Sequence, residues 1–117
     1  MGIRGQKIEL LPGTLDMLVL KILTPRPLHG YGIAQQIHTL SEGVLDVGEG
    51  SLYPALQRLS LKNWVISEWG ITENKRRARY YRLTPDGRRQ VERETREFAR
   101  SIGAIARVMR SAASAED

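Results

Sequence analysis

The sequence predicts a mainly α-helical protein with one small β-hairpin, in the order three short helices, hairpin and long helix. Apolar residues recur with the 3.6-residue period of a helix in four segments of the chain. Two segments rich in β-branched and aromatic residues flank a polar loop, which is the pattern of a hairpin. Positive charge is also localised: residues 1–74 hold six Lys/Arg and seven Asp/Glu, whereas residues 75–110 hold twelve and four.

The composition of the 117-residue chain fits one domain with a modest core. No cysteine is present, which excludes disulfides, thiolate nucleophiles and cysteine-based zinc sites. The longest apolar stretch, Met17 to Leu23, contains Lys21 and is too short to cross a bilayer. The first seven residues lack the apolar core of a signal peptide. We therefore expect a soluble cytoplasmic protein with no membrane partner.

The first two helices are predicted to begin at Thr14 and near His29. Thr14 is expected to cap the first helix, which the segment Thr24–Pro27 ends. The second helix is expected to end at about Leu40, and residues 45–47 to form a short strand. The inward faces of the two helices carry apolar residues at helical spacing: Leu15, Leu18, Val19, Ile22, Leu23, Ile33, Ile37 and Leu40.

The third helix is predicted from about Ser51 to Lys62, with Ser51 as its cap and Pro54 in its first turn. Asn63 can adopt the left-handed conformation that ends a helix. The apolar positions Leu52, Leu56 and Leu59 face inward. Four polar or aromatic residues cannot share that face and are therefore expected to point outward: Ser51, Tyr53, Gln57 and Arg58.

The hairpin is predicted to pair residues 64–69 with residues 78–83, and its loop holds the basic run that starts at Lys75. Thr84, Pro85 and Asp86 are a strong helix start, since they supply a cap, a proline at the first position and an acid. The last helix is expected to continue to about Arg110. Its residues at spacings of four and three form a coiled-coil seam: Val91, Thr95, Phe98, Ile102, Ile105 and Met109.

This element order is that of a winged helix-turn-helix followed by a dimerisation helix. A helix can present side chains to base edges in the major groove, and a basic hairpin beside it can hold phosphate. We predict a winged-helix DNA-binding domain over residues 1–84, a dimerisation helix over 85–111 and a flexible tail over 112–117. Double-stranded DNA and a second copy of the chain are the expected partners. The candidate DNA-binding residues that this pattern indicates are Ser51, Tyr53, Gln57, Arg58, Lys75, Arg76 and Arg77.

The chain resembles PadR-type transcriptional regulators of the short subfamily with a single C-terminal helix. The resemblance lies in four segments that occur in the family's order: residues 13–20, 29–33, 50–59 and 77–87. It implies a dimeric repressor that binds an inverted-repeat operator and is released by a small-molecule effector at the dimer interface. By the same resemblance Tyr31 binds DNA at the start of the second helix, where it touches the backbone. The resemblance also implies that the recognition element consists of Ser51, Tyr53, Pro54 and the face with Gln57 and Arg58, and that Lys75, Arg76 and Arg77 form the tip of the wing.

Other classes of function find less support in the residues. No nucleophile–base pair, phosphate loop or carboxylate pair indicates an enzyme, and no cofactor is expected. His29 and His38 lack a metal-ligand spacing, so no metal site is expected and a turn or surface role is favoured for both. One alternative stays open: a basic winged-helix adaptor that binds RNA or protein without operator specificity.

Overall fold

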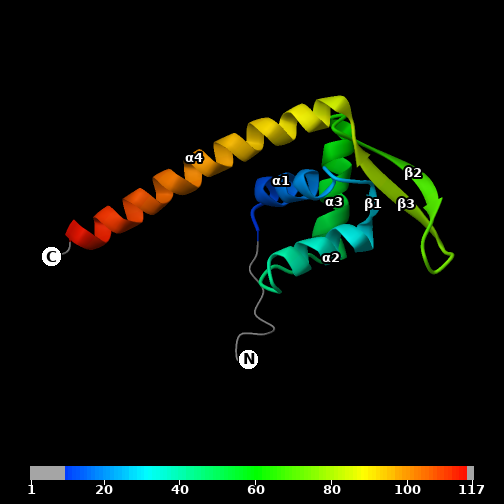
Figure 1. Ribbon diagram of the computed structural model, residues 1–117, viewed down its shortest axis with the longest axis horizontal. Coiled ribbons are helices and arrows are strands. Elements are labelled where there is room, and N and C mark those ends of the chain that lie inside the picture. Colours follow the sequence, from blue (N-terminus) through cyan, green and yellow to red (C-terminus); the bar gives the residue numbers. More distant parts are fainter. Residues whose placement is uncertain (1–9, 116–117) are drawn as a thin grey trace.

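The computed structural model describes residues 10–115 and confirms a mainly α-helical fold with a small antiparallel sheet and a long C-terminal helix (Figure 1). In chain order the elements are α1 (Pro12–Ile22), β1 (Leu28–His29), α2 (Gly30–Leu40), α3 (Glu49–Leu61), β2 (Val65–Ile71), β3 (Arg77–Leu83) and α4 (Pro85–Ala115). The first three helices and the sheet form a winged helix-turn-helix unit, and α4 extends away from it.

The helix starts differ from the predicted ones at two of the first three helices. In α1 the N-cap is Leu11 and the helix begins at Pro12, so Thr14 lies inside the first turn and does not cap it. In α3 the N-cap is Gly48, which places Ser51 inside the helix as well. The earlier start of α1 is explained by Pro12, which needs no partner for a backbone N–H. The earlier start of α3 is explained by Glu49, an acid at the positive end of the helix. The predicted start of α2 is confirmed, since the Nδ1 atom of His29 accepts a hydrogen bond of 3.0 Å from the Gly32 N–H.

The sheet contains one strand that the sequence did not indicate. Its order is β1-β3-β2, with Leu28 opposite Tyr81 in the first pair and Val65 opposite Leu83 in the second. The strand expected at residues 45–47 is not formed. Leu45 and Val47 instead pack half-buried against the core, and the Leu45 N–H donates to the Ser41 hydroxyl at 2.9 Å. The loop thus satisfies both burial and hydrogen bonding without a partner strand.

The core lies where the three short helices meet the inner half of the hairpin. The predicted apolar faces of α1, α2 and α3 contribute to it, and so do the ends of β2 and β3 that lie nearest α4. Leu40 is an exception that corrects its predicted inward position, because it is the last residue of α2, beyond the core, and is 69% exposed. The largest side chains that are almost fully buried are Leu20, Leu23, Ile33, Leu52, Leu56, Leu59, Val19 and Val65. Burial of this shared apolar surface holds α2 and α3 at fixed positions beside the sheet.

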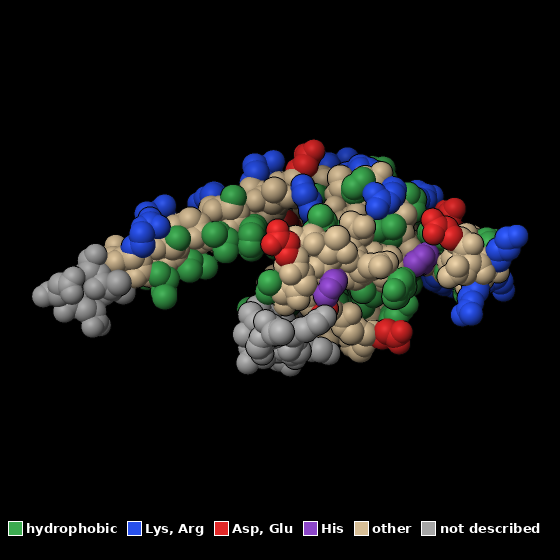
Figure 2. Space-filling view, turned by 60° about the horizontal axis from the view of Figure 1, so that its bottom comes forward, with side chains coloured by type: hydrophobic (Ala, Val, Ile, Leu, Met, Phe, Trp, Pro, Cys, Tyr) green, Lys and Arg blue, Asp and Glu red, His purple; other side chains and the backbone are tan. Residues whose placement is uncertain are grey.

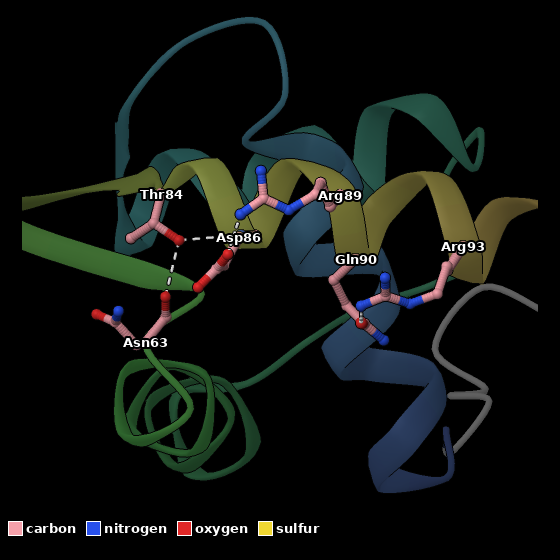
Figure 3. Close-up of polar contacts among 7 residues, drawn as sticks. Asn63, Thr84, Asp86, Arg89, Gln90 and Arg93 are labelled. Atoms are coloured by element: carbon pink, nitrogen blue, oxygen red, sulfur yellow. Dashed lines mark hydrogen bonds and ion pairs between the residues drawn. The ribbon is translucent and has the colours of Figure 1, made fainter.

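The start of α4 is tied to the ends of α3 and the hairpin by one buried threonine (Figure 3). The predicted cap is confirmed: Thr84 Oγ1 accepts from the Gly87 N–H at 2.9 Å and donates to the Asn63 carbonyl at 2.7 Å. The Thr84 N–H also donates to the Trp64 carbonyl at 3.0 Å. Asn63 has a φ of 62°, which confirms its predicted left-handed conformation. These contacts fix the direction in which α4 leaves the domain.

α4 is longer than predicted, since it continues past Arg110 to Ala115. Residues 112–115 of the predicted tail are therefore helical, and residues 116–117 lie outside the described residues. Val91 is only 7% exposed because α4 packs on α1 at this level. Val91 therefore belongs to the core of its own domain, which corrects its assignment to a dimer seam. The seam begins farther along the helix.

The close approach of Gly87 to the Trp64 backbone gives a test of this junction. A Cβ atom at residue 87 would lie 2.1 Å from the Trp64 carbonyl oxygen, so we expect Gly87→Ala to lower the free energy of unfolding by about 1–3 kcal/mol. The matched control is Gly103→Ala in the same helix, where the nearest atom is the Arg107 Nη1 at 3.9 Å. The free energy of unfolding of this control, measured in urea, should rise by about 0.5–1 kcal/mol. Equal stability of the two variants would contradict the role of the junction.

Candidate nucleic-acid interface

The exposed part of α3 divides into two flanks, because one face of this helix is buried. Gln57 and Ser60 lie on the flank beside the hairpin, and they line a shallow groove of about 410 Å³ together with Ser67 and Arg79. Ser51 and Arg58 are seven residues apart, so they share the other flank, next to α1. Pro54 and Leu61 lie between the two flanks and are exposed. The outward residues thus point in several directions.

Arg58 is held by α1 and does not project freely beside Gln57, which corrects its predicted orientation. Its Nη2 and Nε atoms donate to Asp16 Oδ1 and Oδ2 at 2.7 Å and 3.1 Å. The Asp16 side chain is 14% exposed, and the Arg58 side chain is 40% exposed. The hydrogen bond to Asp16 raises the pKa of the Arg58 guanidinium above its ordinary value. This bidentate pair joins α3 to α1 across 42 residues of sequence.

Tyr53 connects α3 to the start of α2. A Cβ atom built on Gly30 would collide with the Tyr53 hydroxyl oxygen, so a side chain at residue 30 would force the Tyr53 ring to shift. The ring is still partly exposed. It borders the groove beside Gln57 and a second groove, which lies between the start of α2 and the hairpin. Tyr53 therefore combines a packing contact with an accessible edge.

The start of α2 presents Tyr31, which is 71% exposed. His29 supports this position, since its ring lies 6.3 Å from the Tyr31 ring and 5.3 Å from the Tyr80 ring. Because the His29 Nδ1 atom accepts the Gly32 N–H, the contact requires an imidazole that is unprotonated at this nitrogen. Tyr31 thus stands at the positive end of a helix, where an anion is favoured.

The hairpin tip, here called the wing tip, is a tight turn over Thr72–Arg76. The Thr72 N–H donates to the Arg76 carbonyl and the Lys75 N–H donates to the Thr72 carbonyl, both at 2.8 Å. Lys75 takes a left-handed φ of 63°, which the turn requires. Lys75, Arg76 and Arg77 are all exposed, so their positive charges face solvent.

A groove of about 760 Å³ separates the start of α2 from the wing and gathers residues from β1, α2, α3, β3 and the hairpin turn. It is lined by Tyr31, Tyr53, Arg76 and Arg77 among the predicted site residues. Ser51, Pro54, Gln57, Arg58 and Lys75 do not line it. Tyr81 forms part of its floor, and burial raises the pKa of this phenol above its ordinary value. An anionic strand laid in this groove would meet a helix start on one side and arginines on the other.

Arg79 is a further candidate residue that the predicted set omits, although it belongs to the same basic run. It lines both grooves, and its Nη1 donates to the Ser67 hydroxyl at 3.2 Å. The alternation of strand β3 was the available signal, because it places Arg77, Arg79 and Tyr81 on one face of the sheet. That face turns toward α3.

The rest of the predicted seam is exposed along one edge of α4. Figure 2 shows apolar side chains on one edge of this helix and Lys/Arg side chains on the opposite edge. Thr95, Phe98, Ile102, Ile105 and Met109 are exposed, and Val108 extends the stripe. The strip therefore has no partner within the described part of its own chain.

The histidines have local structural roles. His29 caps α2, and the His38 Nδ1 atom lies 2.7 Å from Asp46 Oδ1. Across residues 10–115, no group of three or more His, Asp or Glu side chains is placed to hold a metal ion. Over the same residues, no helix is long and apolar enough to span a bilayer.

Comparison with known proteins gives matches over most of the chain. Residues 19–93 match the family described as "Transcriptional regulator PadR-like family". A 37.1 kDa protein in transposon TN4556 of Streptomyces fradiae is 45% identical over 90 residues, which are 77% of this chain and 24% of that protein. The transcriptional regulator Rv3488 of Mycobacterium tuberculosis is 35% identical over 78 residues, which are 64% of this chain and 69% of that protein.

The fold also matches solved structures. A crystal structure of a PadR family transcription regulator from Clostridium difficile is 28% identical to this chain, with a TM-score of 0.72. The match covers 83% of this chain and 99% of the other.

The ion pair between Asp16 and Arg58 gives a prediction on stability. We expect Asp16→Ala and Arg58→Ala each to lower the thermal midpoint, and the double variant to lie close to the worse single variant, because both remove the same contact. Gln57→Ala is the control, because Gln57 is next to Arg58 in the chain but lies on the other flank of α3 and takes no part in the ion pair. If calorimetry shows that the two decreases in thermal midpoint add in the double variant, the pair does not couple α1 to α3.

Proposed function

Because the chain belongs to the PadR-like family of transcriptional regulators, we propose that it is a dimeric repressor that binds an inverted-repeat operator. The observation that carries this proposal is the groove between α2 and the wing, which gathers the start of α2, the Tyr53 flank of α3 and the wing arginines on one side of the domain. Such a surface suits DNA, because a helix can enter the major groove while a basic hairpin beside it contacts the backbone.

Each element of the surface has a distinct proposed task. Gln57 reaches base edges from α3, because an amide can pair with adenine through two hydrogen bonds. Ser51 and Pro54 approach the duplex at the start of the same helix. Tyr31 and Tyr53 donate their hydroxyls to phosphate. Lys75, Arg76 and Arg77 neutralise phosphate charge from the wing. Arg58 has a supporting task, since it holds α3 in place.

The apolar strip of α4 supports the proposed dimer. A single helix with one exposed apolar stripe is stabilised when that stripe is covered, and a second copy of the strip covers it. Two-fold pairing gives two recognition helices that read two half-sites in opposite directions, hence an inverted repeat. Phe98, Ile102 and Ile105 lie where two such strips would meet, and we place the small-molecule effector between them. Binding there would shift the spacing of the two α3 helices.

The experiment that tests the proposal is a mobility-shift titration against the DNA upstream of the protein's own gene. A shuffled duplex of the same composition serves as competitor. Tight binding that resists the shuffled competitor, at two chains per duplex, is the expected result. Binding that the shuffled duplex removes equally well would favour a basic adaptor without operator specificity and contradict the repressor.

Lys75→Ala tests the wing. We expect weaker binding to every duplex by a similar factor, and a salt dependence of log K that is shallower by about one, because one phosphate contact is lost. Alanine keeps a Cβ at the left-handed turn position, so the turn changes little. Lys62→Ala is the matched control, since Lys62 is an exposed lysine at the C-terminal end of α3 and lies outside the wing. An unchanged salt slope in Lys75→Ala would remove Lys75 from the interface.

Ile102→Glu tests the dimer. A charge in the centre of the apolar strip should separate the two copies, because an unpaired carboxylate is costly to bury. Sedimentation velocity should show a monomer for this variant and a dimer for the wild type. Ala104→Glu, on the opposite side of α4, is the control and should remain a dimer. A dimeric Ile102→Glu protein would exclude this strip as the interface.

A further inference from the structure

Trp69 lies on β2, is 56% exposed, and has two arginines against its ring. The Cζ atom of Arg77 is 4.4 Å from the ring centroid, and that of Arg79 is 5.0 Å from it. Both distances fall within the range of a cation–π contact. An exposed tryptophan on a charged hairpin is neither a core residue nor a typical surface residue, so its position calls for a physical reason.

The strand register explains how the three side chains meet. Trp69 stands directly opposite Arg79, and its neighbour Ile71 stands opposite Arg77. Because side chains alternate along a strand, Trp69 shares a sheet face with both arginines. The inner part of the same face carries Val65 and Tyr81, which are buried in the core. The stack is therefore the outward continuation of the face that packs on α3.

The arginines of this stack keep their charge available. Arg79 makes one further hydrogen bond, to the neutral hydroxyl of Ser67 at 3.2 Å. The nearby acid Glu68 lies on the opposite face of the sheet, where it pairs with Arg82 at 3.4 Å. Arg77 and Arg79 are thus oriented by an aromatic ring and a hydroxyl, and both line the groove beside α2.

We infer that Trp69 is a positioning residue for DNA binding: its ring holds Arg77 and Arg79 in the orientation that contacts backbone phosphate. This inference rests on the proposed DNA-binding function. A free arginine loses side-chain freedom when it binds phosphate, and a stacked arginine has lost much of it already. Trp69 therefore raises affinity without touching the duplex, and it does so equally for all DNA sequences.

The test is a double-mutant cycle measured by fluorescence anisotropy with a labelled random-sequence duplex. In the wild-type background, Trp69→Ala should weaken binding about five- to tenfold, the effect of two less ordered arginines. In the Arg77→Ala/Arg79→Ala background, the same change should have almost no effect. Trp69→Phe keeps an aromatic face and should recover most of the affinity. Ile71→Ala, an exposed apolar residue of the same face and strand, should bind like the wild type.

A second readout examines the stack without DNA. In nitrogen-labelled protein, the side-chain NMR signals of Arg77 and Arg79 should carry a ring-current shift that disappears in Trp69→Ala. Circular dichroism controls for folding of each variant. Unchanged arginine signals would overturn the inference, because the ring would then not orient these groups.

The outcomes separate the inference from the proposed function. An equal loss from Trp69→Ala in both backgrounds would mean that the ring itself contacts DNA, and would overturn the positioning role while leaving DNA binding intact. A wild-type protein that binds no duplex at low salt would overturn the proposed function and the inference together.

Discussion

Leu52, Leu56 and Leu59 anchor α3 in the core by a single apolar face, and the other parts of the surface depend on that one-sided burial. A helix held in this way has two flanks outside the core, and the elements beside each flank determine which of its side chains stay accessible. On one flank α1 places Asp16 against Arg58, which fixes the helix along its length. The opposite flank faces the sheet and stays accessible. Packing of the neighbouring elements thus explains why one flank of α3 is held by α1 and the other stays accessible.

α4 obeys a similar constraint at larger scale. Its apolar stripe is continuous from Val91 to Met109, but only the first part finds a partner within the domain. The junction at Thr84 and Gly87 sets the direction of the helix, and beyond Val91 this direction carries the stripe away from α1. One sequence pattern therefore contributes to a core at one end and offers an interface at the other.

Most of the fold follows from local sequence signals. The caps at His29 and Thr84, the left-handed Asn63 and the apolar faces of the helices each depend on residues close in the chain. The starts of α1 and α3 were misplaced by local residues, but two other errors arise where distant segments of the chain meet. Arg58 is turned aside by a carboxylate 42 residues away, and β1 forms only because β3 offers it an edge. A two-residue strand has too few positions to show alternation.

The candidate site shows the same pattern. The basic run and the outward orientation of Tyr53 could be found from composition and helical spacing alone, whereas Tyr31 was indicated by the resemblance to the PadR family. The stack of Trp69 with Arg77 and Arg79 could not, because it depends on the register of β2 against β3 and on the turn that sets it. Likewise Tyr53 is both exposed and packed, since Gly30 happens to lie beneath its ring. A residue that is both packed and accessible, as Tyr53 is, can be recognised only when the positions of the neighbouring helices and strands are known.

In the proposed complex, α3 and the wing of each copy engage one duplex, and the α4 strip relates the two copies. Hydroxyl-radical footprinting on a bound operator is the decisive test of this arrangement. We expect two protected patches with the same pattern in opposite directions, whose centres lie about one helical turn, or a multiple of it, apart. A single protected patch, or protection spread evenly along the duplex, would contradict it.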